Sequence, residues 1–268
     1  MDLLREKKLF VMDMDGTIYL GEKVIKGAPE FIQRVRDNGA KVMYFTNNAS
    51  KNPDIYIDKL TRLGFSASRE EIVTSGDVTV GFLNKHRKGK SVYLVGTPAL
   101  HETFEKAGIH PVKEGEKADI VVVSFDTTVT YAKLENACTL IRNGAEFLST
   151  HQDINCPTED GFIPDSGAIC AAITAATGKE PRYFGKPYEA TVNYVEEKTG
   201  AERSDVCIFG DRLYTDIAFG IKHGITATLV MTGETTEEDL AAAAPEHRPD
   251  VVLPSLKEAE IEIFGDNN

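Results

Sequence analysis

Short apolar runs rich in β-branched residues alternate with amphipathic segments along nearly the whole chain. This alternation is typical of parallel strands joined by helical crossovers, so it predicts an α/β fold. The expected strands are Leu9–Asp13, Lys41–Thr46, Ser91–Val95, Ile120–Ser124, Ala145–Ser149, Asp205–Phe209, Thr226–Val230 and Asp250–Leu253. The expected helices are Pro29–Asn38, Pro53–Leu63, Asp77–His86, Pro98–Ala107, Tyr131–Asn143, Gly167–Thr177, Tyr188–Lys198, Thr215–His223 and one from Ser255 onward.

The number of expected strands favours two domains over one. A usual sheet has about five or six strands, and eight strands exceed that number. A chain of 268 residues has room for two domains, since a domain takes roughly 100–200 residues. We therefore expect two sheets, each with its own helices.

Composition and charge exclude several classes of protein. Hydrophobic residues make up 41% and charged residues 27%, the mix of an ordinary globular protein. The net charge of −12 argues against a binder of nucleic acid or of an anionic membrane. No apolar run approaches the roughly 20 residues of a membrane span, and Met1–Lys8 does not resemble a signal peptide, so we expect a cytoplasmic protein. The four cysteines form no CxxC pair and predict no zinc or redox site.

The first expected strand delivers two carboxylates to its carboxyl end. Its apolar run Leu9–Met12 leads directly into Asp13, Met14, Asp15, Gly16 and Thr17. In open parallel sheets, ligands bind at the carboxyl ends of the strands. A glycine there lets the backbone turn tightly, so that its N–H groups can face an anion. The sequence therefore predicts an anion-binding site at Asp13 and Asp15.

Two further segments supply polar groups of the kind that bind phosphate. The second expected strand ends at Thr46 and is followed by Asn47, whose amide, like the threonine hydroxyl, suits a phosphate oxygen. These residues also cap helices, so a cap for the helix that begins at Pro53 is the alternative interpretation. Lys186 stands between a glycine and a proline just before another expected helix. This restricted position favours a functional lysine over one that is simply exposed to solvent.

A second acidic pair follows the strand Asp205–Phe209. Asp211 lies just beyond its end, and Asp216 lies five residues further along the chain. Carboxylates at a strand end offer the hard oxygen ligands that Mg²⁺ prefers. We expect Mg²⁺ to be the cofactor.

These four segments together resemble the motifs of the haloacid dehalogenase superfamily of phosphohydrolases, in the family's order. The motifs are D-x-D-G-T, a threonine at a strand end, a lysine, and G-D-x-x-x-T-D. The residues within and next to these motifs are similar to those of the NagD-like, p-nitrophenylphosphatase-like branch (subfamily IIA). The resemblance implies a Rossmann-like core with a parallel sheet and an α/β cap domain inserted after the second motif.

The spacing of the motifs leaves room for such a cap. Thr46 and Lys186 are separated by 139 residues, far more than one crossover needs. The three middle strands and their helices can supply a separate sheet. We place the first part of the core at residues 1–80, the cap at 81–181 and the second part of the core at 182–268.

The resemblance and the chemistry of the side chains assign the same catalytic roles. Asp13 is the expected nucleophile, which forms an aspartyl phosphate. Asp15 is the expected acid and then base. The resemblance implies that Mg²⁺ binds the Asp13 carboxylate, the Asp15 carbonyl and Asp211, supported from further out by Asp216. It also implies that Lys186 shields the charge of Asp13 from that of the incoming phosphate. Thr46 and Asn47, with Lys186, would bind the phosphate.

A loop of the expected cap departs from the family pattern. Relatives commonly have Asn-Pro-Asp where this chain has His151, Gln152 and Asp153. We expect His151 and Asp153 to face the leaving group and to set substrate specificity. The alternative is a hydrogen-bonded loop inside the cap with no role in substrate choice.

The sequence thus predicts a Mg²⁺-dependent phosphatase that hydrolyses phosphate monoesters of a small metabolite such as a sugar phosphate or a nucleotide. A phosphomutase on the same scaffold, a phospho-accepting signalling protein and a non-catalytic sensor of sugar phosphates are the alternatives. A dehalogenase needs neither Asp15 nor Asp211, so the presence of both residues argues against that activity. The expected partner is the small phosphorylated substrate, without nucleic acid or membrane, and a homodimer is expected from the family alone.

Overall fold

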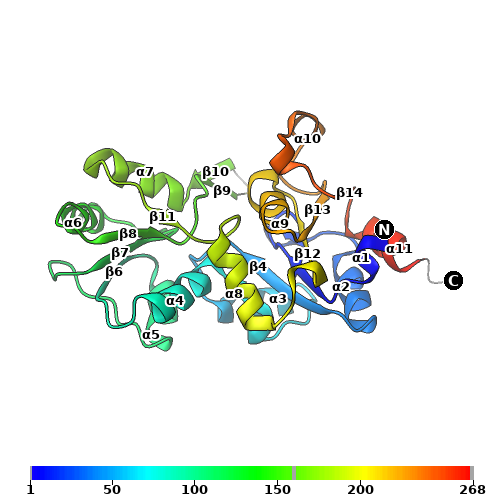
Figure 1. Cartoon of the computed structure of the whole chain (residues 1–268), viewed down its shortest axis with the longest axis horizontal. Coiled ribbons are helices and arrows are strands. Elements are labelled where there is room, and N and C mark those ends of the chain that lie inside the picture. The colour runs from blue at the N-terminus through cyan, green and yellow to red at the C-terminus, as the bar shows by residue number, and fades with distance from the viewer. Residues whose placement is uncertain (1, 159–160, 266–268) are drawn as a thin grey trace. The chain divides into compact units, whose positions relative to one another are not determined.

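The computed structural model describes residues 2–158 and 161–265, which form two compact units (Figure 1). The first unit comprises the described parts of residues 1–46, 56–73 and 186–268, and the second comprises those of residues 47–55 and 74–185. No helix in the described ranges is both long and apolar enough to cross a membrane.

The first unit is built on a six-stranded sheet with the strand order β14-β13-β12-β1-β4-β5. Its strands are β1 (Leu9–Met12), β4 (Lys41–Thr46), β5 (Ile72–Thr74), β12 (Val206–Gly210), β13 (Thr226–Val230) and β14 (Val251–Leu253). β1 pairs in parallel with both β4 and β12, and all four of its side chains are buried. Its uninterrupted apolar sequence is that of a central strand covered on both faces.

Seven of the described helices lie wholly or mainly in the first unit. They are α1 (Asp2–Arg5), α2 (Ala28–Asp37), α3 (Pro53–Arg62), α8 (Glu189–Thr199), α9 (Ala218–His223), α10 (Glu237–Ala242) and α11 (Leu256–Phe264). An antiparallel hairpin of β2 (Tyr19–Leu20) and β3 (Lys23–Val24) follows β1. The core packs Phe31 of α2 against Phe10 and Phe209 of the sheet, with ring centroids 6.1 and 5.2 Å away.

The second unit has its own four-stranded sheet with the order β11-β8-β7-β6. The strands are β6 (Val92–Val95), β7 (Ile120–Val123), β8 (Glu146–Ser149) and β11 (Arg182–Tyr183), and all pairs are parallel. The helices are α4 (Ser75–His86), α5 (Pro98–Lys106), α6 (Tyr131–Arg142) and α7 (Ser166–Thr177). A hairpin of β9 (Asn155–Thr158) and β10 (Gly161–Pro164) precedes α7.

The structure confirms the predicted α/β class and all eight expected strands, with ends that differ by about one residue. β5, β11 and both hairpins were not predicted, because strands of two to four residues are too short to show a period. α1 and α10 were not predicted either. The helix expected from Thr215 begins instead as a wider π-helical turn at Leu213–Ile217, which then continues into α9. The core and cap boundaries remain a prediction.

Candidate active site

Three neighbouring strands of the first unit bring the expected site residues to one edge of the sheet. Asp13 follows β1, Thr46 ends β4 and Asp211 follows β12. Because the strands are parallel and adjacent in the order β12-β1-β4, their carboxyl ends meet there. The Asp13 N–H still donates to the Phe209 carbonyl at 2.9 Å, so the ladder reaches as far as Asp13.

Lys186 lies between two carboxylates at this edge. Its Nζ donates to Asp13 Oδ1 and to Asp216 Oδ1, both at 2.6 Å, and to the Phe45 carbonyl at 3.2 Å. The Lys186 side chain is only 2% exposed, so these ion pairs are shielded from water. Charge-assisted hydrogen bonds of this length are strong and fix the position of Asp13.

The π-helical turn explains how Asp216 reaches Lys186. The N–H groups of Asp216 and Ile217 both donate to the Arg212 carbonyl, at 3.1 and 3.2 Å. Turns of this kind are frequent at functional sites because the extra residue changes the direction of a side chain. The sequence pattern predicts an ordinary helix here and does not indicate the turn.

The site contains more acidic than basic side chains. Burial raises the pKa of Asp13 well above its usual range, Lys186 opposes the rise, and the charges of Asp216 and Asp211 add to it. Burial, with the charge of Asp216, raises the pKa of Asp211 to about 7. Burial alone would lower the pKa of Lys186, but Asp13 and Asp216 raise it above its ordinary value, so it stays a cation. Three carboxyl groups thus lie close together, Lys186 pairs with two of them, and further positive charge would stabilise their ionised forms.

The arrangement fits a divalent cation. Asp13, Asp211 and Asp216 each offer a carboxylate oxygen, and these atoms lie within 4.8 Å of one another. Asp211 Oδ1 is buried and has no hydrogen-bond partner among the described residues. Its other oxygen, Oδ2, accepts the N–H of Glu234 at 2.7 Å. A buried carboxylate oxygen without a partner is costly, and an oxygen-only set suits Mg²⁺.

Two glycines make room for the Asp211 carboxylate. A Cβ added at Gly16 would lie 2.4 Å from Asp211 Oδ2, and one added at Gly233 would lie 2.0 Å from the same atom. The φ of Gly16 is +92°, a conformation that other residues rarely adopt. Sequence analysis noted Gly16 only as a turn residue and missed Gly233. The signal for Gly233 was its position three residues after the apolar strand β13, at the same edge of the sheet.

Asp15 lies beside the site, on the turn after Asp13. Its Oδ2 accepts a hydrogen bond from the Tyr19 hydroxyl at 3.3 Å. Burial, with the nearby Asp15 charge, raises the pKa of Tyr19 well above its ordinary value, so the phenol remains a donor. Lys59 Nζ lies 3.7 Å from the centre of the Tyr19 ring. Asp15 is half-buried, and its hydrogen bond with Tyr19 restricts the orientation of its carboxyl group.

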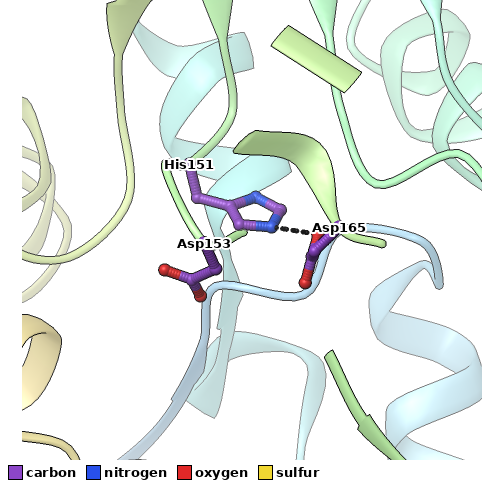
Figure 2. Close-up of side chains that lie close together, drawn as sticks. All are labelled: His151, Asp153 and Asp165. Carbon is purple, nitrogen blue, oxygen red and sulfur yellow. Dashed lines mark hydrogen bonds and ion pairs between the residues drawn. The ribbon is translucent and has the colours of Figure 1, made fainter. Parts of the chain in front are cut away.

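The remaining predicted residues gather within the second unit. Asn47 Nδ2 donates to the two carboxylate oxygens of Asp153 at 3.4 and 3.3 Å. Figure 2 shows His151 and Asp165 directed at each other, with Asp153 beside them. His151 Nε2 lies 2.8 Å from Asp165 Oδ1, and sequence analysis missed Asp165 as its partner. His151 and Asp153 are almost fully buried, which favours the hydrogen-bonded alternative, and a role in substrate choice remains a prediction.

The fold and the site define an α/β protein with a parallel sheet, in which strand-end carboxylates surround a buried lysine. The sequence profile described as haloacid dehalogenase-like hydrolase matches residues 10–110, and a second, HAD-hydrolase-like profile matches residues 183–259. The acid sugar phosphatase of Staphylococcus saprophyticus is 38% identical over 237 residues, which are 88% of this chain and 91% of that protein. The chain therefore belongs to the haloacid dehalogenase-like hydrolases, in the NagD-like branch, and is a phosphatase.

Solved structures agree with this assignment. A 4-nitrophenylphosphatase from Thermotoga maritima is 40% identical, with a TM-score of 0.92 over 97% of this chain and 99% of that one. A glycerol phosphate phosphatase from Mycobacterium tuberculosis, solved with magnesium, is 32% identical, with a TM-score of 0.89 over 95% of this chain and 77% of that one.

Proposed function

We propose that this phosphatase hydrolyses phosphate monoesters of sugars and similar small metabolites through an aspartyl phosphate on Asp13. One observation carries the proposal: Lys186 holds the Asp13 carboxylate at 2.6 Å, at the end of a central strand. A carboxylate fixed in this way is prepared to attack phosphorus, and the ammonium beside it offsets the negative charge of an approaching phosphate.

In the first step, one oxygen of the Asp13 carboxylate attacks phosphorus and forms an acyl phosphate. The bond between phosphorus and the ester oxygen breaks at the same time. Asp15, in its protonated form, donates its proton to the departing oxygen, which leaves as an alcohol. Tyr19, which donates to Asp15, restricts the orientation of the carboxyl group for this transfer.

In the second step, the ionised Asp15 removes a proton from a water molecule. The water oxygen attacks phosphorus, the bond to Asp13 breaks, and inorganic phosphate is released. Asp13 is then again a carboxylate and Asp15 is again protonated. Lys186 keeps its ion pair with Asp216 in both steps and holds its positive charge beside the group attached to Asp13. Thr46 and Asn47 bind phosphate oxygens through their polar groups.

Asp13, Asp211 and the carbonyl of Asp15 would hold Mg²⁺, and Asp216 would support the set from the Lys186 side. Asp211 Oδ1, which has no hydrogen-bond partner within residues 2–158 and 161–265, and the cluster of three carboxylates support this choice. Bound Mg²⁺ would supply positive charge that offsets the charge on the transferring phosphoryl group.

The names of the relatives support the substrate class. Curated relatives are called acid sugar phosphatases, and similar structures are a 4-nitrophenylphosphatase and a glycerol phosphate phosphatase. Sugar and polyol phosphates are therefore the first compounds to test. The cytoplasmic location and the homodimer stay predictions, as does the cap at residues 81–181.

Phosphate release from a panel of phosphorylated metabolites and nitrophenyl phosphate tests this proposal. We expect turnover of sugar phosphates that requires a divalent cation. Asp58→Asn, on an exposed face of α3, is the matched control and should keep full activity. The proposal is wrong if none of these esters is hydrolysed, or if Asp13→Asn keeps activity within tenfold of the parent. Isomerised sugar phosphate without phosphate release would favour the mutase alternative.

A further inference from the structure

A buried polar network in the second unit joins three segments that are distant in the sequence. His151 Nδ1 lies 2.9 Å from Thr150 Oγ1 and 3.3 Å from Ser75 Oγ. The Ser75 hydroxyl in turn donates to the carbonyl oxygen of Asn47. His151 Nε2 lies 2.8 Å from Asp165 Oδ1 (Figure 2). His151 and Ser75 are fully buried.

The hydroxyl hydrogens around His151 decide which ring nitrogens carry protons. A serine or threonine hydroxyl has one hydrogen to donate. Ser75 uses its hydrogen on the Asn47 carbonyl, and Thr150 uses its hydrogen on Ser124 Oγ at 2.9 Å. Both hydroxyls can therefore only accept from His151 Nδ1. Nδ1 must carry a hydrogen to make either contact.

The other ring nitrogen faces an acceptor as well. Asp165 Oδ1 also accepts the N–H of Ser166, the first residue of α7, at 2.5 Å. The N-terminus of a helix favours the ionised form of a carboxyl group. A neutral ring with its hydrogen on Nδ1 would direct a lone pair at this carboxylate. With Asp165 ionised, both nitrogens of His151 require a hydrogen, and these contacts point to an imidazolium.

The local charges agree with a cationic ring. His151, Asp153 and Asp165 each offer an atom within 4.8 Å of the others, so two carboxyl groups surround one imidazole. A cation between them lowers the cost of burying both charges. The same three side chains have the composition of a metal site, but a proton on Nε2 occupies the position that a metal would need.

The network also contacts the residues next to Thr46 and Lys186. Asn47 directly follows Thr46, and Gly185 directly precedes Lys186. A Cβ added at Gly185 would lie 2.7 Å from Asn47 Oδ1 and 3.1 Å from His151 Cβ. The second unit therefore packs His151 against the residues that precede Lys186 and follow Thr46.

We propose that His151 is a buried imidazolium that positions Asn47 for phosphate binding, acting through Ser75. The inference rests on the proposed function because it takes Asn47 as a phosphate ligand. In this proposal His151 does not contact the leaving group. It acts instead through a hydrogen-bond chain that runs from Asp165 through His151 and Ser75 to the Asn47 carbonyl. Since every substrate carries the phosphate, a defect in this chain affects all substrates alike.

Nitrogen NMR of the histidine side chains tests the protonation state independently of activity. At pH 8 an unperturbed histidine is neutral, and we expect His151 to show N–H signals from both ring nitrogens. Asp165→Asn, which keeps a helix-capping side chain, should reduce them to one. A single N–H signal in the parent protein would overturn the proposal. So would a Zn²⁺ titration that removes only the Nε2–H signal, because the cluster would then be a metal site.

Enzyme kinetics test the positioning role. His151→Gln should raise the inhibition constant of inorganic phosphate and the KM of every ester by roughly tenfold, the factor that 1.4 kcal/mol of lost binding gives, with kcat within a few-fold. Ser75→Ala should give the same rise while keeping both His151 N–H signals. His101→Gln, a histidine of the same unit outside the network, is the control and should change neither quantity.

The kinetic outcomes separate this proposal from its rivals and from the proposed function. A loss confined to sugar phosphates, with nitrophenyl phosphate and inorganic phosphate unaffected, would assign His151 to specificity and overturn positioning. Unchanged phosphate affinity in Ser75→Ala would also overturn it. If the parent protein hydrolyses no ester, the proposed function fails, whereas the NMR signals still report on the His151 charge.

Discussion

Replacement of Lys186 by methionine tests the electrostatics of the site most severely. The substitution keeps much of the side-chain volume but removes the ammonium that Asp13 and Asp216 share. Removing one partner of a buried ion pair typically costs about 3–5 kcal/mol, because the other charge stays buried without compensation. We expect a loss of this size in the metal-free protein at pH 8. At roughly 2–4 °C per kcal/mol, the Tm should fall by roughly 6–20 °C.

The cost should depend on pH in a defined direction. The raised pKa of Asp13 and the pKa of about 7 for Asp211 mean that the folded protein binds these protons more tightly than the unfolded chain. Such groups destabilise the fold as the pH rises toward 7 and above. Without Lys186 this effect grows, so the difference between Lys186→Met and the parent should be largest at pH 8 and smaller at pH 5.5.

Urea unfolding in the presence of a chelator, followed by circular dichroism at both pH values, measures this difference. Lys8→Met is the matched control, because Lys8 forms an ion pair with Asp205 of similar length, 2.9 Å, but its side chain is 75% exposed. The control should be nearly as stable as the parent, since exposed ion pairs contribute little. Equal stability of Lys186→Met and the parent at pH 8, or a larger difference at pH 5.5, would refute the reasoning.

Three further predictions concern the metal, the nucleophile and the second unit. Asp211→Asn should weaken Mg²⁺ binding, measured by calorimetry, by more than the roughly 10–100-fold expected for Asp216→Asn; the reverse order would exchange their roles. Asp13→Asn should lower kcat at least ~10⁴-fold with an unchanged circular dichroism spectrum, and a lost spectrum would leave a folding defect as the cause. Gly167→Ala would place a Cβ 2.2 Å from the Gln152 carbonyl oxygen, so thermal unfolding should show a loss of about 1–3 kcal/mol; an unchanged Tm would contradict this packing.

The strand-end residues were predictable from the sequence for a physical reason. Parallel strands that are neighbours in a sheet bring their carboxyl ends together, and the order β12-β1-β4 makes the strands before Asp13, Thr46 and Asp211 neighbours. The apolar runs before them show that these strands are buried. The place of Lys186 followed only from the family resemblance, because no period predicts which side chain a loop lysine will contact.

The details of the site were not predictable because they depend on contacts between distant segments. Asn47 and Asp153 are 106 residues apart in the sequence, and one sequence alone carries no signal that joins them. The space that Gly233 leaves for Asp211 depends on the path of a loop after β13. The π-helical turn before α9 differs from an ordinary helix by one residue per turn, which hydrophobic periodicity does not resolve.

Direct detection of the phosphorylated enzyme tests the central claim, that Asp13 is the nucleophile. Asp15→Asn lacks the base that activates water, so it should accumulate the acyl phosphate when nitrophenyl phosphate, whose leaving group needs no protonation, is the substrate. After an acid quench, peptide mass spectrometry should find one base-labile phosphoryl group on Asp13. Phosphate on another residue, or a burst of nitrophenol without phosphorylated protein, would contradict the account.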